Sequence, residues 1–198
     1  LTYTPDPDFN GSDSFTFVAN DGTVDSNTAT VSITVNAIND APVFTSDPFS
    51  AGGAVEELAY NDHIGDAATD VDGDSLTYDK VSGPAWLSVA TDGSLSGTPL
   101  TADVGSNSFV VSASDGAATT EATLNIEVVP ALVVTFNADG GTAPDPASKK
   151  VGNGLTYGSL ATTSRVGYSF EGWFTANLGG GDLVESTTEV TFTADHTL

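Results

Sequence analysis

One strand–turn–strand pattern occurs twice in the chain, and this repeat constrains the fold more than any other feature. The first copy alternates apolar and polar residues over 14–35 and turns at Asn20-Asp21-Gly22. The second copy does the same over 107–128 and turns at Asp115-Gly116. Alternation with a period of two is typical of half-buried strands. The copies are about 94 residues apart, which is the size of a whole β-sandwich domain. We therefore interpret the chain as a slice of a tandem array.

The charge and composition exclude several classes of function. There are 27 acidic against 4 basic residues, which gives a net charge of −23. Such a chain lacks the clustered Lys and Arg that nucleic acid requires, and it is equally unsuited to anionic membrane surfaces. The absence of cysteine excludes disulfides and zinc–thiolate sites. No apolar run is long enough to predict a membrane span in this segment. A surface rich in carboxylates suits divalent cations instead.

Charge and proline positions divide the chain into three segments, 1–42, 43–130 and 131–198. The first has six acids and no base, the second fourteen acids and one base, and the third seven acids and three bases. About 42 residues with one hairpin cannot bury a stable core alone. We therefore expect the first segment to be the C-terminal part of a sandwich whose other strands lie elsewhere.

Shorter apolar runs predict further strands in the second and third segments. In the second segment we expect strands over 54–60, 76–78 and 86–89, with Glu56 and Glu57 as solvated strand residues. In the third segment we expect one strand after Val133 and a late one over 190–192. None of the segments has a convincing helical period, so the predicted fold class is all-β.

Two resemblances cover the first two segments. The first segment, from Tyr3-Thr4-Pro5 to Asn39-Asp40-Ala41-Pro42, resembles the second half of a bacterial cadherin-like (VCBS-type) repeat. The second segment resembles the dystroglycan-type cadherin-like domain, which is also described as immunoglobulin-like. Its landmarks are the run 70–78, Pro84-Ala85-Trp86-Leu87 and the run 93–99. These resemblances imply tandem Greek-key β-sandwiches of the cadherin/immunoglobulin-like type.

The third segment resembles a different family, the Listeria–Bacteroides repeat or internalin B-repeat. The resemblance depends on Gly140-Gly141 and on the run Gly167-Tyr168-x-Phe170-x-Gly172-Trp173-Phe174. It implies a small β-grasp-like module of bacterial surface proteins. Because the family pattern continues through one more aromatic-containing strand, we expect this module to lack its last strand.

The cadherin-like resemblance implies a calcium site at the first joint, because such junctions gather carboxylates from both domains and from the linker. The Asp-x-Asp-x-Asp loop and the last hairpin turn of the second segment would converge on the linker, and acids of the first segment would face it. Ca²⁺ takes six to eight oxygen ligands, and alternate carboxylates in a loop point to one side. The expected ligands are Asn39, Asp40, Asp70, Asp72, Asp74 and Asp115, with Asp8 and Asp13 from the first segment.

These acids have two other interpretations. Asp-Gly and Asn-Asp pairs are common turn formers on soluble surfaces, so they need not bind a metal. The run Asp6-x-Asp8-x-Asn10-Gly11 resembles the start of an EF-hand loop, but position twelve is Phe17 where that loop requires Glu. The second joint, 128–132, has no Asn-Asp pair or carboxylate cluster, so we expect Pro130 and apolar contact to stiffen it.

The sequence gives little support for catalysis. His63 and His196 have no metal-ligand spacing, and no nucleophile motif is present. Polysaccharide binding is the stronger alternative, because the rings of Trp86, Trp173, Tyr168 and Phe174 could stack on sugars if exposed. A lone Trp in a small β-domain is more often a core residue, and we expect this for both tryptophans.

The function predicted from the sequence is that of a non-catalytic, calcium-rigidified stalk, adhesin or filament segment of a large bacterial surface or secreted protein. Its expected partners are calcium and neighbouring repeats of the same polypeptide or identical subunits. Cell-surface or matrix polysaccharide is a further candidate partner. The alternative is an accessory polysaccharide-binding array of a secreted carbohydrate-active enzyme.

Overall fold

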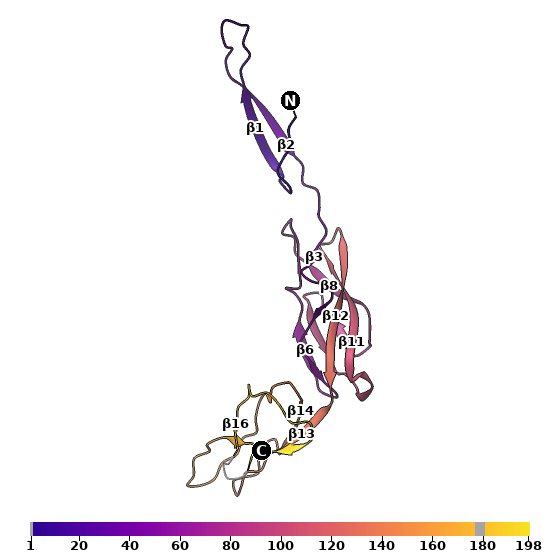
Figure 1. The fold of residues 1–198 in the computed structure, drawn as a ribbon, viewed down its shortest axis with the longest axis vertical. Helices are drawn as coiled ribbons and strands as arrows, with labels where there is room; N and C mark the ends of the chain where they lie inside the picture. Colours follow the sequence, from indigo (N-terminus) through magenta and orange to yellow (C-terminus); the bar gives the residue numbers. More distant parts are fainter. Residues whose placement is uncertain (1, 177–180) are drawn as a thin grey trace.

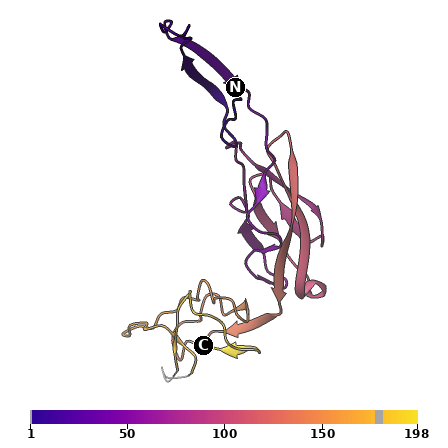
Figure 2. The same ribbon diagram turned by 45° about the horizontal axis from the view of Figure 1, so that its top comes forward.

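The computed structural model describes residues 2–176 and 181–198 and divides them into three parts, a hairpin, a sandwich and a third part (Figure 1). One hydrophobic core is built from residues between 54 and 128, and another from residues between 134 and 198. Both views show the parts in sequence order, with the hairpin and the third part at opposite ends of the sandwich (Figure 2). Among the described residues, the single helical element is the short 3₁₀ turn η1 (Thr101–Asp103). The all-β prediction is therefore confirmed.

The hairpin consists of β1 (Gly11–Phe17) and β2 (Ala29–Val35), which pair antiparallel. Phe15 lies opposite Val31, and these two side chains are only half-buried. None of residues 2–41 is buried. The hairpin therefore has regular strands and an apolar face, but this part has no core of its own.

The last two strands of the sandwich, β11 (Gly105–Ser114) and β12 (Thr119–Val129), repeat the hairpin in register. Phe109 lies opposite Leu124, just as Phe15 lies opposite Val31 in the hairpin, but Phe109 and Leu124 are completely buried. The repeated sequence pattern therefore folds twice into the same local structure, and the packing around it differs.

The sandwich has two main sheets and one small one. The larger sheet has the order β4-β12-β11-β8, with β5 also paired to β12, and the facing sheet has the order β6-β10-β9. A two-stranded sheet joins β3 to β7. Pairing of β12 with β11 is antiparallel, whereas its pairing with β4 and β5 is parallel. The remaining strands of the sandwich are β3 (Val43–Phe44), β4 (Phe49–Ser50), β5 (Ala54–Val55), β6 (Tyr60–His63), β7 (Ala68–Thr69), β8 (Thr77–Ser82), β9 (Leu87–Val89) and β10 (Ser94–Gly97).

The strand predicted over 54–60 is instead two short strands in different sheets. β5 ends at Val55 and pairs with β12, whereas β6 begins at Tyr60 and pairs with β10. Between them Glu57 has a φ of 57°, a left-handed conformation that ends the extended chain. The prediction of one continuous strand is wrong because the chain crosses here from one sheet to the other.

The third part is built around a three-stranded sheet of order β14-β13-β17 and a two-stranded sheet of β15 and β16. Val134 and Val190 are completely buried in its core. The strand predicted over 190–192 is not found, because the backbone of Val190 bonds to the 154–155 turn. The strands of this part are β13 (Ala131–Thr135), β14 (Ser148–Gly152), β15 (Trp173–Phe174), β16 (Leu183–Val184) and β17 (His196–Thr197).

Candidate functional site

The loop between β7 and β8 brings three carboxylates together at the hairpin end of the sandwich. Asp70, Asp72 and Asp74 each offer one oxygen, and these oxygens all lie within 4.8 Å of one another. Gly73 has a φ of 78°, which the tight turn of this loop requires and which glycine adopts without strain. Calcium–oxygen distances of about 2.3–2.6 Å put opposite ligands about 5 Å apart, so the spacing fits one calcium ion.

Asp70 is the most constrained member of this loop. Its Oδ1 accepts hydrogen bonds from the backbone N–H groups of Asp72 at 2.8 Å and Asp74 at 3.4 Å. Its Oδ2 is buried and has no hydrogen-bond partner. A buried carboxylate oxygen without a donor is costly. The donor set and the unpartnered oxygen therefore both fit a bound cation.

The linker between the hairpin and the sandwich bonds to two loops of the sandwich. The backbone N–H of Asp40 donates to Oδ2 of Asp72 at 2.8 Å. Nδ2 of Asn39 donates to Oδ2 of Asp115 at 2.9 Å and to the carbonyl of Asp40 at the same distance. Asp115 lies in the turn between β11 and β12. The structure thus brings together the Asn-Asp pair of the linker and both acidic loops, which the sequence separates widely.

The carboxylate of Asp115 is held in its charged form by several donors. The backbone N–H of Ala118, the amide of Asn39 and the backbone N–H of Ala117 lower the pKa of Asp115 below its ordinary value. The distances from Ala117 N and Ala118 N to Oδ1 are both 2.6 Å. Asp115 therefore positions the linker as an ionised acceptor.

The two expected ligands from the hairpin lie outside this cluster. Asp13 lies near the start of β1, and its carboxylate accepts from the Tyr3 hydroxyl at 2.9 Å and from the Ser14 backbone N–H at 2.7 Å. Asp8 has a φ of 59° in the loop that precedes β1. Because Gly11 pairs with Val35, this loop lies at the hairpin end from which the linker leaves. The structure does not group Asp8 or Asp13 with the acids of the sandwich, so their role as ligands stays a prediction.

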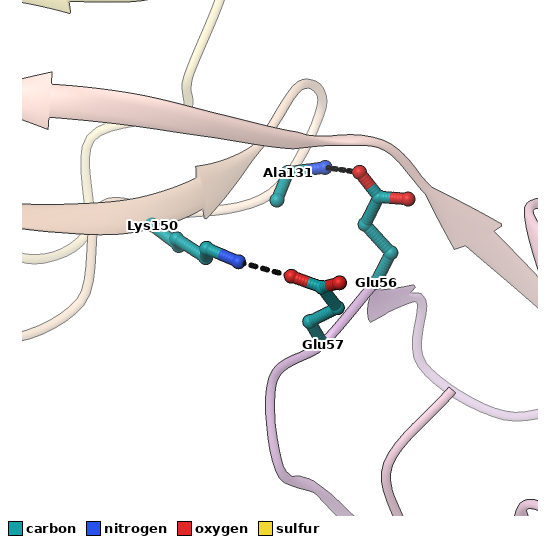
Figure 3. Close-up of polar contacts among 4 residues, drawn as sticks. All are labelled: Glu56, Glu57, Ala131 and Lys150. Carbon is teal, nitrogen blue, oxygen red and sulfur yellow. Dashed lines mark hydrogen bonds and ion pairs between the residues drawn. The ribbon is translucent and has the colours of Figure 1, made fainter. Parts of the chain in front are cut away.

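The second joint contains polar contacts that the sequence did not predict (Figure 3). Oε1 of Glu56 accepts a hydrogen bond from the backbone N–H of Ala131 at 3.2 Å. Oε2 of Glu57 pairs with Nζ of Lys150 at 2.5 Å, which lowers the pKa of Glu57 below its ordinary value. Glu56 and Glu57 are therefore neither strand residues nor merely solvated, and that expectation is wrong. They lie in the turn after β5 and contact the third part.

The apolar contact expected at the second joint is also present. Gly152, the last residue of β14, packs so closely that an added Cβ would lie 2.5 Å from Val129 Cγ2 and 2.8 Å from Val55 Cγ2. A Cβ added to Gly53 would likewise lie 3.1 Å from Leu155 Cδ2. β12 ends at Val129 and β13 begins at Ala131, so Pro130 alone separates the two strands.

Trp173 belongs to the core of the third part, and Trp86 is half-buried against the core of the sandwich. Trp173 is 4% exposed, and its Nε1 donates to the carbonyl of Ala161 at 2.8 Å. Trp86 packs edge-on against Tyr60 and Phe109, and its Nε1 donates to Oδ1 of Asn107 at 3.1 Å. The exposed aromatic rings of the third part are instead Tyr168 and Phe170. A sugar-stacking role for the tryptophans therefore has no support from their exposure.

Comparison with protein-family models gives two matches. The model of the bacterial Ig domain matches residues 1–34 and 39–127. The model of the Listeria–Bacteroides repeat domain matches residues 133–198. The comparison with curated proteins gives no match.

Similar solved structures include glycoside hydrolases and protocadherins. An endo-fucoidan hydrolase of glycoside hydrolase family 107 is 34% identical over 61% of this chain, with a TM-score of 0.43. This chain spans only 19% of that enzyme's length. Human protocadherin-24 EC1-2 is 20% identical over 64% of this chain and 61% of its own, with a TM-score of 0.37. In the described residues, no helix is long and apolar enough to cross a membrane.

Proposed function

Because the chain belongs to the bacterial Ig domain family and ends in a Listeria–Bacteroides repeat, we propose that it is a non-catalytic, calcium-rigidified stalk segment of a bacterial surface or secreted protein. Both families are typical of surface or secreted proteins, and Ig-like domain families are generally non-catalytic. The proposed task is mechanical, because calcium at the first joint would hold the hairpin and the sandwich in one relative orientation.

The observation that carries this proposal is the buried, unpartnered Oδ2 of Asp70 among three converging carboxylates. Among the described residues the one ion pair is that of Lys150 with Glu57, so no basic side chain neutralises these acids. Like charges at such short range repel one another strongly unless a cation binds. A calcium ion would be held by Asp70, Asp72 and Asp74 of the sandwich.

The other proposed ligands connect this ion to the linker and the hairpin. Asn39 and Asp115 already contact each other, and Asp40 contacts Asp72 through its backbone. Asp40 and Asp115 would add carboxylate oxygens, and Asn39 an amide oxygen. Asp8 and Asp13 would contribute from the hairpin end that faces the linker. When bound, the ion supplies positive charge that makes convergence of these acids favourable.

Calcium titration of the full chain by isothermal calorimetry tests this proposal. We expect saturable binding, and we expect Asp70→Asn to weaken it by about tenfold or more, since charged ligands set the affinity of such sites. The matched control is Glu121→Gln, which removes one exposed negative charge from β12 away from the cluster. If no binding is seen, or if both variants bind as the parent does, the proposal fails.

A second candidate function is favoured by one observation. Accessory binding of polysaccharide, as in a part of a secreted carbohydrate-active enzyme, would require exposed aromatic rings near polar groups. Tyr168 is 68% exposed and Phe170 is 52% exposed, and both line a cavity of the third part. The proposed partners of the chain are a neighbouring stalk segment, an identical subunit and a matrix polysaccharide.

A further inference from the structure

Resting on the second candidate function above, we propose that the cavity of the third part is a binding site for an uncharged sugar residue of a polysaccharide. The cavity has a volume of about 540 Å³ and lies between the turn at 137–141 and the segment 163–174. This volume is within the range of about 300–1,000 Å³ that is typical of small-molecule sites. The site lies in a different part of the molecule from the carboxylate cluster, so it does not depend on calcium at the first joint.

The aromatic side of this cavity is formed by two exposed rings with ordered surroundings. Phe170 packs edge-on against the buried ring of Trp173, with the ring centroids 5.4 Å apart. Tyr168 lies under the guanidinium of Arg165, whose Cζ is 4.3 Å from the ring centroid. Nη1 of Arg165 also donates to the carbonyl of Asp139 at 3.2 Å. These contacts fix the rings while leaving much of their surface open to solvent.

The polar side of the cavity offers both donors and acceptors. The guanidinium of Arg165 can donate hydrogen bonds to a ligand, and the carboxylates of Asp139 and Glu171, which line the same cavity, can accept them from a ligand. A sugar ring has apolar C–H faces that stack on aromatic rings and hydroxyl groups at its edge that both donate and accept. The lining therefore matches a sugar residue in each respect.

The charges near the cavity favour an uncharged ligand over an anionic one. Arg165 is outnumbered by Asp139 and Glu171, which line the same cavity, so these side chains together give the lining a net negative charge. The chain as a whole carries a net charge of −23. A sulfated or carboxylated sugar would therefore meet like charges both within the site and around it. An uncharged sugar avoids this repulsion and can use both carboxylates as acceptors.

Affinity electrophoresis of the full chain through gels that contain polysaccharides tests this site. The probes are a β-glucan, a mannan and a galactan, with a sulfated galactan and a polyuronate as charged counterparts. We expect at least one uncharged polysaccharide to slow migration equally with calcium and with a chelator. Tyr168→Ala should weaken that binding about tenfold, which is the effect of losing roughly 1.4 kcal/mol of stacking.

The matched control is Val166→Ala. Val166 is completely exposed, lies two residues from Tyr168 and does not line the cavity. A second readout is the fluorescence of Trp173 in a Trp86→Phe background, because a sugar on Phe170 would change the surroundings of the adjacent indole. Folding of each variant is checked by its melting temperature.

Three outcomes would overturn the proposal. The first is unretarded migration with every uncharged probe. The second is binding that Tyr168→Ala and Val166→Ala affect equally, which would place the contact elsewhere. The third is binding only to the charged probes, which would show that the site selects anions. Loss of calcium binding with sugar binding intact would instead count only against the stalk proposal.

Discussion

The two joints of the molecule hold neighbouring parts together by different polar contacts. At the first joint, three carboxylates of one loop converge and the linker bonds to two acidic loops, with no basic side chain among them. At the second joint, Glu56 bonds to a backbone N–H and Glu57 pairs with Lys150. Among the described residues, two buried carboxylate oxygens have no hydrogen-bond partner, Asp70 Oδ2 at the first joint and Glu56 Oε2 at the second.

The difference lies in where the positive charge comes from. The second joint obtains it from the protein itself, through Lys150 and backbone donors, and adds close packing of Gly152 on Val55 and Val129. Among the described residues of the first joint, 36–41 are all exposed, Ile38 to 82%, and Pro42 is buried only where the sandwich begins. A joint without protein cations and with so little apolar packing is expected to depend on an ion from solution. The comparison therefore predicts that one joint responds to calcium and the other does not.

Removal of calcium should have the largest effect on the first joint. Ligation of the folded state alone adds about 2.7 kcal/mol of stability at a hundredfold excess over Kd. In scanning calorimetry, the melting temperature of the sandwich should therefore be several degrees lower with a chelator than with calcium. The transition of the third part should stay where it is. If the scans with calcium and with a chelator are identical, the first joint does not depend on calcium and does not differ from the second in this respect.

Overpacking should break the second joint without calcium being involved. In Gly152→Val, the new side chain would collide with Val55 and Val129, which costs about 2 kcal/mol when a packed contact cannot relax. Denaturant unfolding followed by the fluorescence of Trp173 measures this in a Trp86→Phe background. The control Ser148→Ala, at an exposed position of the same strand, should leave stability nearly unchanged. An undisturbed joint in Gly152→Val would show that the packing is not tight.

Removal of the linker amide should have a smaller effect, at the first joint only. Asn39→Ala deletes the donor to Asp115, and one such hydrogen bond contributes about 1 kcal/mol. Because the chain has no cysteine, spin labels can be placed at Thr30→Cys and Thr91→Cys. The distribution of distances between the two spin labels should be broader in Asn39→Ala than in the parent chain, and broader still with a chelator. Asn36→Ala, in the same exposed segment, serves as the control and should keep the parent distribution.

The smallest expected effect is the pH response of the second joint. Lys150 lowers the pKa of Glu57 below its ordinary value of 4.5, so the unfolded chain binds more protons than the folded chain near that pH. The stabilisation is therefore fully present above pH 4.5 and is lost as the pH falls through the lowered value. The pair is half-exposed, so the change should be small and screened by salt. If Glu57→Gln loses stability at acid pH in the same way as the parent chain, this assignment is contradicted.

Much of the fold follows from local pattern. The alternating runs at 14–19, 28–35, 107–114 and 122–128 predict β1, β2, β11 and β12, because each has one apolar face. The carboxylate loop was also predictable, since Asp70, Asp72 and Asp74 are close in sequence and Gly73 permits the turn. The bonds from Asn39 and Asp40 to distant loops were expected from a resemblance, since no local signal links those residues.

The second joint could not be predicted in the same way. Glu56 and Glu57 follow an apolar pair that suggests a strand, and only the change of sheet places them in a turn. Their partners are 75 and 93 residues away in the chain. The exposure of Tyr168 and Phe170 could not be predicted either, because the aromatic run at 168–174 contains both core and surface rings. Which ring is buried depends on tertiary packing that periodicity does not encode.

The parallel pairing of β12 with β4 and β5 has a consequence for how the sandwich bears load. The chain enters the sandwich at Pro42 and leaves it at Val129, and β4 and β5, which follow its entry, run in the same direction as its last strand β12. A force that pulls on the two ends therefore slides these strands past each other instead of peeling them apart. Sliding loads the hydrogen bonds at Ala51 and Glu56 together, whereas peeling would break them one by one. The sandwich is thus arranged to resist stretching along its length.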